Sequence, residues 1–285
     1  MIVHWLRRLL TALGSRATSP TAAVIRPDLS RVPASRRAEV VATHARMMAA
    51  LPYERITVPG AQAWDHWLRL RAAGRGWPII VGDDDAMERL AEHYSLSDPA
   101  VFPGALPDMV QTLAPSEILR EAEGLRFPEI MDRWPDGPDE DQIGVMEDDW
   151  EDFPPMPDGP PRLSVVHDHN QKPYARVHIL LIPTDQGWQV PAYLRWGGWN
   201  ECPPPESHVA ALRVWHEKYG AELIVLSNDT MELRVDRRPA DKAEAWDLAR
   251  NQYRYCRDIV DQGVGTVGAL AGGLLQTPYW FFWWD

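Results

Sequence analysis

The chain has 285 residues, of which 45% are hydrophobic and 25% are charged, and its formal net charge is −12. This length accommodates one large domain or two smaller ones. The negative charge disfavours nucleic-acid binding, because an acidic surface repels a phosphate backbone, and it favours a basic protein as partner. The chain has only two cysteines, and no stretch approaches the roughly 18 apolar residues of a membrane span. We therefore expect a cytoplasmic protein that does not cross a membrane.

Residues 1–50 are predicted to form a basic N-terminal arm followed by a helix. Arginines outnumber acidic residues here, and Ser35 is a suitable N-cap for a helix that ends before Pro52. Residues 1–13 place apolar side chains on one helical stripe. This pattern is typical of a helix packed on its own domain and also of a helix on a membrane surface, and both interpretations stay open.

Residues 51–128 are predicted to form a βαβα-type region. Residues 55–58 and 77–81 have the pattern of strands with a helix between them, and a right-handed connection would make the strands parallel. The acidic run Asp83–Asp85 follows the second strand. Neighbouring carboxylates can hold Mg²⁺, but we favour a simpler role in which Asp85 caps the following helix.

Residues 129–161 are predicted to form an acidic, proline-rich linker. Their acids and prolines leave too little apolar area to offset the entropy of ordering, so we expect the greatest protease sensitivity at residues 136–160. Trp134, Trp150 and Phe153 are the side chains able to hold parts of the linker against the domains.

Residues 162–285 are predicted to form a C-terminal α+β domain. A hairpin is expected from residues 176–183 and 188–196, then a helix that Gly220 ends, and then a second hairpin around the turn at residues 227–230. Asp241 and Thr266 begin two further helices, and the aromatic C-terminus is expected to be a buried strand. The predicted fold class is α+β, with the N-terminal βαβα-type region and a C-terminal mixed sheet of hairpins packed with helices.

Three motifs of the C-terminal region resemble a bacterial family known only as domain of unknown function 4253. They read WGGWNECPPPE, then YCRDIVDQG, then FFWWD, and the earlier segment GRGWPIIVGDDD is similar to a strand and turn of longer members. The resemblance implies a bacterial or phage-associated cytoplasmic protein. It brings no activity, substrate or catalytic residue.

The most unusual local sequence is the Gly-Gly loop at residues 197–203. Because the loop leads into a helix N-terminus, which can lower the pKa of a thiol, Cys202 with His208 or His216 could be a nucleophile and its base. A plain connection between two elements explains the same residues. We also expect residues 197–203 to line a concave surface together with Trp196, Trp199 and His208. The predicted binding residues are Trp196, Gly197, Gly198, Trp199, Asn200, Glu201 and Asp229.

His167 and His169 have the chemistry of metal ligands, and alternate residues of a strand face the same way. Their sequence precedes a Lys-Pro turn, where exposed polar residues are common, so we expect neither a metal nor another cofactor.

Three functions are compatible with these features. We favour a non-enzymatic module that binds a basic protein, as an immunity or defence protein would, because acidic side chains steer association and aromatic side chains anchor it. The alternatives are a hydrolase or transferase that uses Cys202 and His208, and a protein held at a membrane surface by residues 1–13.

Overall fold

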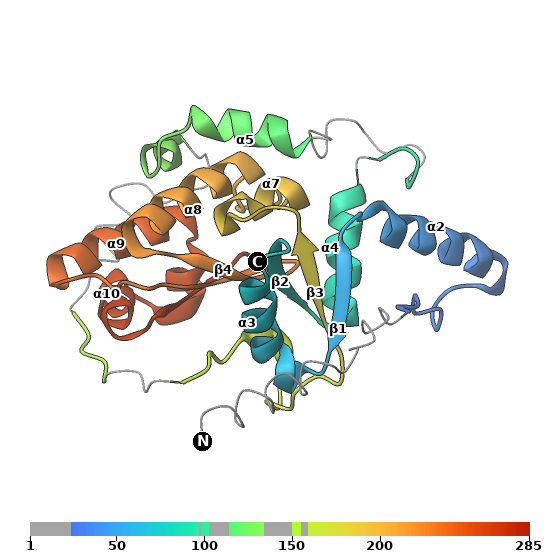
Figure 1. Ribbon diagram of the computed structural model, residues 1–285, viewed down its shortest axis with the longest axis horizontal. Coiled ribbons are helices and arrows are strands. Elements are labelled where there is room, and N and C mark those ends of the chain that lie inside the picture. The colour runs from blue at the N-terminus through green and yellow to red at the C-terminus, as the bar shows by residue number, and fades with distance from the viewer. Residues whose placement is uncertain (1–23, 97, 103–113, 134–149, 155–158) are drawn as a thin grey trace, which may run out of the picture.

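The computed structural model describes residues 24–96, 98–102, 114–133, 150–154 and 159–285 (Figure 1). Their fold is α+β, as predicted, and it is built on one mixed six-stranded sheet in the order β1-β3-β2-β4-β5-β6. The strands are β1 (Glu54–Val58), β2 (Trp77–Gly82), β3 (Val177–Ile182), β4 (Glu222–Leu226), β5 (Thr230–Arg234) and β6 (Tyr279–Trp283).

The sheet takes strands from both regions that the sequence analysis separates. β3 lies between β1 and β2 and is antiparallel to both, so β1 and β2 run in the same direction without being neighbours. β2 pairs with β4 in parallel, and β4, β5 and β6 follow as an antiparallel meander. Residues before and after the acidic segment therefore share one hydrogen-bonded sheet.

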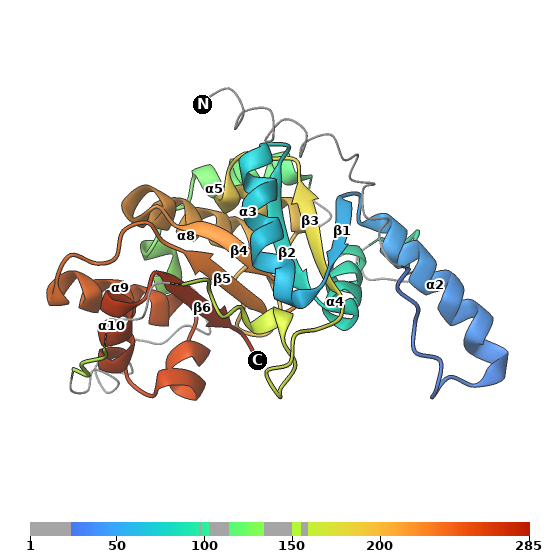
Figure 2. The same ribbon diagram turned by 60° about the horizontal axis from the view of Figure 1, so that its bottom comes forward.

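Helices cover both faces of this sheet (Figures 1 and 2). α3 lies over one face, and α4, α7, α8 and α9 lie on the other, with α10 against α9. The α-helices are α2 (Arg37–Ala50), α3 (Ala63–Ala73), α4 (Asp84–Ser95), α5 (Pro115–Glu123), α7 (Val190–Leu194), α8 (Pro205–Tyr219), α9 (Lys242–Tyr255) and α10 (Val267–Gln276). The short helical turns are η1 (Ala34–Arg36), η2 (Gly60–Gln62), η3 (Glu129–Arg133), η4 (Ser164–Val166), η5 (Gly187–Gln189) and η6 (Ile259–Val264).

Residues 188–196 do not form the predicted strand. They form the end of η5 and the helix α7, in which Pro191 occupies the first turn. A proline has no N–H for a sheet ladder, but in the first turn of a helix that N–H has no partner to lose. The strand interpretation was therefore wrong, and β3 pairs with β1 and β2 instead.

Local signals elsewhere predicted the elements correctly, except that Ser35 lies inside η1 and does not cap α2. The hairpin β4–β5 forms, Gly220 ends α8 in a left-handed conformation, and Thr266 caps α10 through the N–H of Ala269. Asp241 accepts a hydrogen bond from the N–H of Glu244, as its capping-box pattern requires. The cap of α4, however, is Asp83, which accepts from the N–H of Ala86, so the assignment of that role to Asp85 was wrong.

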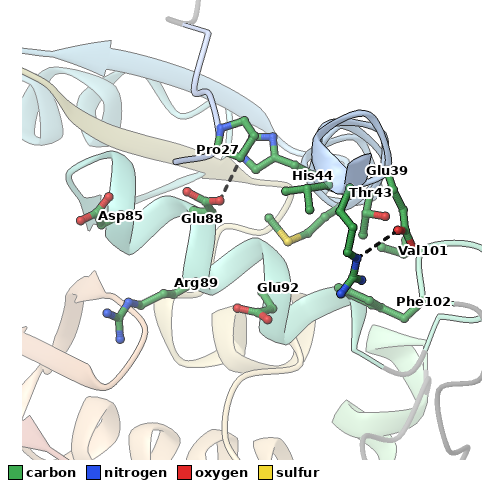
Figure 3. Close-up of a pocket in the computed structure, with 13 residues that line it drawn as sticks. Pro27, Glu39, Thr43, His44, Asp85, Glu88, Arg89, Glu92, Val101 and Phe102 are labelled. Atoms are coloured by element: carbon green, nitrogen blue, oxygen red, sulfur yellow. Dashed lines mark ion pairs between the residues drawn. The ribbon is translucent and has the colours of Figure 1, made fainter. Parts of the chain in front are cut away.

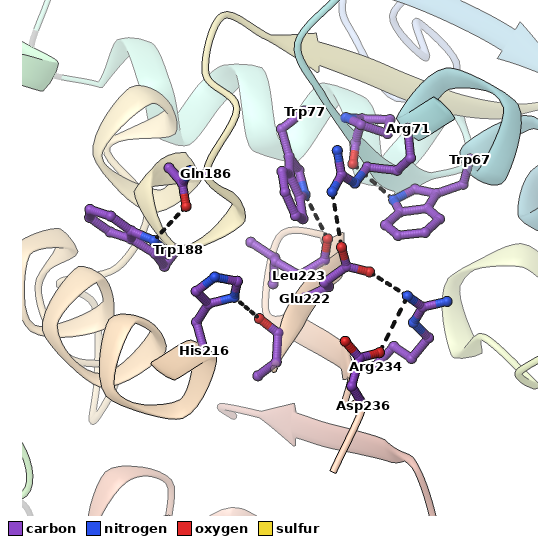
Figure 4. Close-up of polar contacts among 12 residues, drawn as sticks. Trp67, Arg71, Trp77, Gln186, Trp188, His216, Glu222, Leu223, Arg234 and Asp236 are labelled. Carbon is purple, nitrogen blue, oxygen red and sulfur yellow. Dashed lines mark hydrogen bonds and ion pairs between the residues drawn. The ribbon is translucent and has the colours of Figure 1, made fainter. Parts of the chain in front are cut away.

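An ion-pair network joins α3 to the C-terminal strands (Figure 4). Glu222 of β4 lies 2.9 Å from Arg71 of α3 and 2.7 Å from Arg234 of β5. The Arg71 guanidinium also lies 3.7 Å from the centre of the Trp77 ring, and the Trp77 indole N–H donates to the carbonyl of Leu223. Because Glu222 is largely buried, loss of its carboxylate would remove the ion pair of Arg71 and leave Arg234 with only Asp236, 3.7 Å away, among the described ion pairs.

The described part of the acidic segment lies against α9 and α10. The Trp150 ring packs 6.1 Å from the Trp246 ring, with the Lys242 ammonium 4.3 Å from the Trp150 ring centre. Phe153 and the carbonyl of Glu151 approach Gly272 so closely that a side chain at Gly272 would meet them. Trp150 and Phe153 thus hold this segment in place, whereas Trp134, residues 1–13 and most of residues 136–160 lie outside the described residues.

Within the described ranges, no helix has the length and apolar character needed to span a membrane.

Candidate functional site

The Gly-Gly loop connects α7 to α8 and turns tightly at Gly197. This residue has a φ of 115°, and a Cβ at its position would lie 2.7 Å from the His208 imidazole and inside contact distance of the Pro203 carbonyl. Gly198 has a φ of 84° but open space around it, and its N–H donates to the Pro203 carbonyl at 2.9 Å. The close approach expected of the two glycines therefore occurs at Gly197.

The loop places Cys202 against His208, as the sequence suggested, and adds a third polar group. Cys202 Sγ lies 3.4 Å from His208 Nε2, and His208 Nδ1 lies 2.6 Å from the Tyr255 hydroxyl. The Tyr255 hydroxyl in turn lies 3.6 Å from the Met231 sulfur. Tyr255 is 47 residues beyond His208, and in the sequence it stands out only as the first residue of the motif YCRDIVDQG.

Burial sets the charge state of this Cys–His–Tyr cluster. Cys202 and His208 are both 0% exposed, inside a cage that includes the rings of Trp196 and Trp284. Burial raises the pKa of the Cys202 thiol well above its usual range and lowers the pKa of His208 to about 3. A nucleophilic cysteine needs the opposite arrangement, a thiolate beside a charged imidazole. In this conformation the cluster is therefore neutral core packing, and a reaction at Cys202 would require the core to open.

The residues predicted to form a binding surface divide between core and surface. Trp196 and Gly197 are buried, and the Trp196 indole donates to the carbonyl of Ser227 at 2.6 Å. Gly198, Asn200 and Glu201 are exposed, while Trp199 and Asp229 are half-buried. Trp199 packs between the rings of His93 and Trp196, with centroid distances of 4.7 and 4.9 Å.

Two polar members of this set, Asn200 and Asp229, bond to the last two residues of the chain. Asn200 donates to the carbonyl of Asp285 at 2.7 Å, and the N–H of Asp285 donates to the Asp258 carboxylate at 2.9 Å. The N–H of Trp284 donates to the carbonyl of Asp229 at 3.1 Å. We call this region the C-terminal acidic surface, and its carboxylates are those of Glu201, Asp229, Asp258 and Asp285.

His167 and His169 belong to a turn and not to a strand. His167 forms an isolated bridge with Pro173, and the Asp168 carboxylate accepts from the N–H groups of Asn170 and Lys172 across the turn. Within the part of the chain that the structure describes, no group of three or more His, Cys, Asp or Glu side chains could hold a metal ion.

The acidic run after β2 also contributes ion pairs through Asp84. Asp84 lies 2.8 Å from Nε2 of His178, and it also pairs with Arg176. His178 is fully buried in β3, and its Nδ1 lies 3.2 Å from the Thr57 hydroxyl of β1. Burial lowers the pKa of His178, while the bond to Asp84 opposes that change. Asp84 therefore joins the start of α4 to the neighbouring strands.

A groove along β6 is a feature that the sequence did not reveal. Its volume is about 600 Å³, a size typical of ligand-binding pockets, and β6, η6 and α10 form its walls. Phe153, Val264 and Phe281, which are among the six large apolar residues most exposed in the described chain, all line it. We call this feature the β6 groove. Apolar surface gathered in this way is typical of a binding site.

A buried carboxyl group lies beside the β6 groove. Glu232 of β5 accepts hydrogen bonds from the N–H of Ser164 at 2.8 Å and from its hydroxyl at 2.6 Å, and Ser164 lines the groove. Burial raises the pKa of Glu232 to about 7, although the bonds from Ser164 act in the opposite direction. A neutral carboxyl can thus exist here near neutral pH.

A second groove, of about 610 Å³, lies between α2 and α4 (Figure 3). His44 of α2 is buried at its base with Nε2 3.3 Å from the Glu88 carboxylate of α4, and burial raises the pKa of Glu88. This groove lies outside the C-terminal region that carries the motifs.

Fold and site together define an α+β protein whose candidate surfaces lie around the last strand of a mixed sheet. Residues 178–285 match the family described as Domain of unknown function (DUF4253), which confirms the resemblance over the C-terminal region. The match does not include the GRGWPIIVGDDD segment. Neither the curated proteins nor the solved structures gave a match.

Proposed function

We propose that this protein is a non-enzymatic module that binds a basic protein partner through its C-terminal acidic surface. The observation that carries the proposal is that Asn200 and Asp258 both bond to Asp285. Glu201 follows Asn200 in the loop, and Asp229 bonds to the neighbouring Trp284 through its carbonyl. The net charge of −12 would speed encounter with a basic protein, and carboxylates at the contact would set its orientation.

The aromatic side chains of this region support the same function. Trp199 is half-buried beside Asn200 and Glu201, and rings of this kind supply much of the binding energy at protein interfaces. The rings of Trp196 and Trp284 lie 5.4 Å apart beneath it and give it a rigid base. By contrast, the neutral, buried Cys202–His208 pair gives no support to the hydrolase or transferase alternative.

We further propose that the partner relationship is that of an immunity or defence protein in the cytoplasm. Two features agree with this proposal: the acidic charge suits neutralisation of a basic toxin, and Cys202 and Cys256 are both free thiols. A toxin gene beside the gene for this chain would support this role, and a conserved neighbour with an acidic product would oppose it.

Affinity capture with charge variants tests the binding proposal. The test variant combines Glu201→Gln with Asp285→Asn, and the control combines Glu39→Gln with Asp247→Asn, two exposed carboxylates on α2 and α9. Both variants remove two charges, so the net charge is matched. We expect the wild-type protein and the control to retain a basic host protein at low salt, and the test variant to lose it. Equal retention by both variants would contradict the proposed surface.

A further inference from the structure

Among the residues that the structure describes, no strand pairs with the outer edge of β6. Every second residue of β6 bonds to β5 through its backbone. The N–H of Val235 donates to the carbonyl of Pro278, and the N–H of Trp284 donates to the carbonyl of Asp229. The residues between these bonded positions are Tyr279, Phe281 and Trp283. In an antiparallel pair the N–H and C=O of the alternate residues point away from the neighbouring strand. The backbone of Phe281 therefore points outward from the sheet.

The neighbours of Phe281 along this edge already have partners. The Thr277 hydroxyl bonds to the N–H and the C=O of Tyr279, at 3.1 and 3.2 Å, and the Trp283 carbonyl accepts from the Cys256 thiol at 3.0 Å. Among the described residues, the N–H and C=O of Phe281 have no such partner. An approaching strand could thus form one paired set of two hydrogen bonds at Phe281 and little beyond it.

The β6 groove surrounds this open position with apolar side chains. Val264 is 48% exposed and Phe281 is 49% exposed, and Leu270 and Leu274 of α10 form part of the opposite wall. β6 is the outermost strand of the sheet, with α9 and α10 beside it (Figure 2). A free strand edge beside an apolar groove is the arrangement that binds extended peptides by strand addition.

Charge at the groove selects the kind of peptide. Of the described residues that line it, Asp258 is the only one charged at neutral pH, and no basic side chain lines it. Asp258 also belongs to the C-terminal acidic surface, because its carboxylate binds the N–H of Asp285. Asp285 follows Phe281 by four residues, a distance of roughly 13 Å along a strand.

We propose that the β6 groove binds an extended, basic segment of the partner protein, which pairs with the backbone of Phe281 and places a lysine or arginine at Asp258. This inference rests on the proposed function and adds the contact mode to it. The segment would carry apolar side chains at alternate positions for the groove, and its basic residue would lie about four positions from the residue paired with Phe281.

Selection from a phage-displayed library of random linear peptides tests this inference. Phe281→Pro removes the phenyl ring and also the outward-facing N–H, a loss that edge strands tolerate, and Phe281→Ala removes the ring but keeps that N–H. Val264→Lys places a cation in the groove without disturbing the core. Val41→Lys on α2 is the matched control, because Val41 is 45% exposed and lies outside this groove.

We expect enriched peptides with alternating apolar residues and a basic residue. Their affinity should be about tenfold or more lower for Phe281→Pro than for Phe281→Ala, because only the proline variant also lacks the N–H that pairs with the peptide. It should also fall about tenfold or more for Val264→Lys and stay unchanged for Val41→Lys. If the Phe281→Pro variant fails to fold, the affinity of the Val264→Lys variant still tests whether the peptide binds in the β6 groove. Failure to enrich any peptide, or equal binding by the Val264→Lys and Val41→Lys variants, would overturn the inference. The Glu201→Gln, Asp285→Asn variant could lose a basic partner that the Val264→Lys variant still binds. This result would overturn the proposed role of the β6 groove and leave the proposed function standing.

Discussion

Replacement of Glu232 by glutamine should abolish a specific pH dependence of stability. Glu232 is buried in β5, and its carboxyl accepts two hydrogen bonds from Ser164. Burial raises its pKa from 4.5 to about 7. Glutamine keeps the acceptor oxygen for Ser164 and has nearly the same shape, but it cannot ionise.

The sign and the size follow from the raised pKa. Between pH 4.5 and about 7 the unfolded chain is ionised at this position while the folded protein holds a proton. Folding therefore takes up a proton, and the free energy of unfolding falls as pH rises through this window. One unit of pKa corresponds to about 1.4 kcal/mol, so the whole decrease attributable to Glu232 is roughly 3 kcal/mol. This contribution is constant below and above the window.

Chemical unfolding of both proteins between mildly acidic and mildly alkaline pH measures this effect. The difference in unfolding free energy, Glu232→Gln minus wild type, should rise by roughly 3 kcal/mol from pH 4.5 to pH 8, because every other titrating group cancels in the difference. Glu54→Gln, at a half-exposed position of β1, is the control for the removal of a carboxylate outside the core. A difference for Glu232→Gln that stays flat with pH would refute the assignment of a proton to this carboxyl.

The remaining predictions concern the loop, the thiols and the two ends of the C-terminal region. Gly197→Ala should lower the free energy of unfolding by well over the roughly 1–2 kcal/mol that a left-handed backbone costs, whereas Gly198→Ala should lower it by only about that amount. Thermal unfolding of the two variants measures this difference, and equal losses of stability would contradict the close approach of Gly197 to His208. Both thiols should resist a disulfide reagent at neutral pH until the protein unfolds, and rapid reaction of Cys202 would revive the catalytic alternative. Deletion of residues 280–285 should give insoluble or molten protein, because Trp280, Phe282 and Trp284 are buried, and a soluble truncation with a cooperative transition would argue against it. Limited proteolysis should cut first within residues 136–160, and first cleavage elsewhere would show that this segment is protected.

Local features of the fold could be predicted because short-range chemistry determines them. The caps at Asp241 and Thr266 and the left-handed end of α8 at Gly220 depend on residues within one turn. The same reasoning failed at Pro191, because an alternating pattern over a short apolar run fits a strand as well as a buried helix. The helix forms because it buries Val190, Ala192 and Leu194 against neighbouring elements.

The long-range features could not be predicted from such signals. Insertion of β3 between β1 and β2 joins residues that are 96 to 127 positions apart, and no local pattern encodes that pairing. The same holds for Tyr255, which completes the cluster with His208 from a distant helix. The β6 groove depends on which strand ends the sheet, so its open position at Phe281 follows from the strand order alone.

The affinity of a captured basic partner for the wild-type and variant proteins shows whether the C-terminal acidic surface is the binding site. It should be measured with purified proteins at low and at high salt, for the wild type, the Glu201→Gln, Asp285→Asn variant and the Glu39→Gln, Asp247→Asn control. We predict that salt weakens the binding of the partner to the wild type and to the control. At low salt the affinity of the test variant should be lower by about tenfold or more, and it should depend less on salt. Equal affinities of test and control variants, with equal salt dependence, would contradict a binding role for the C-terminal acidic surface.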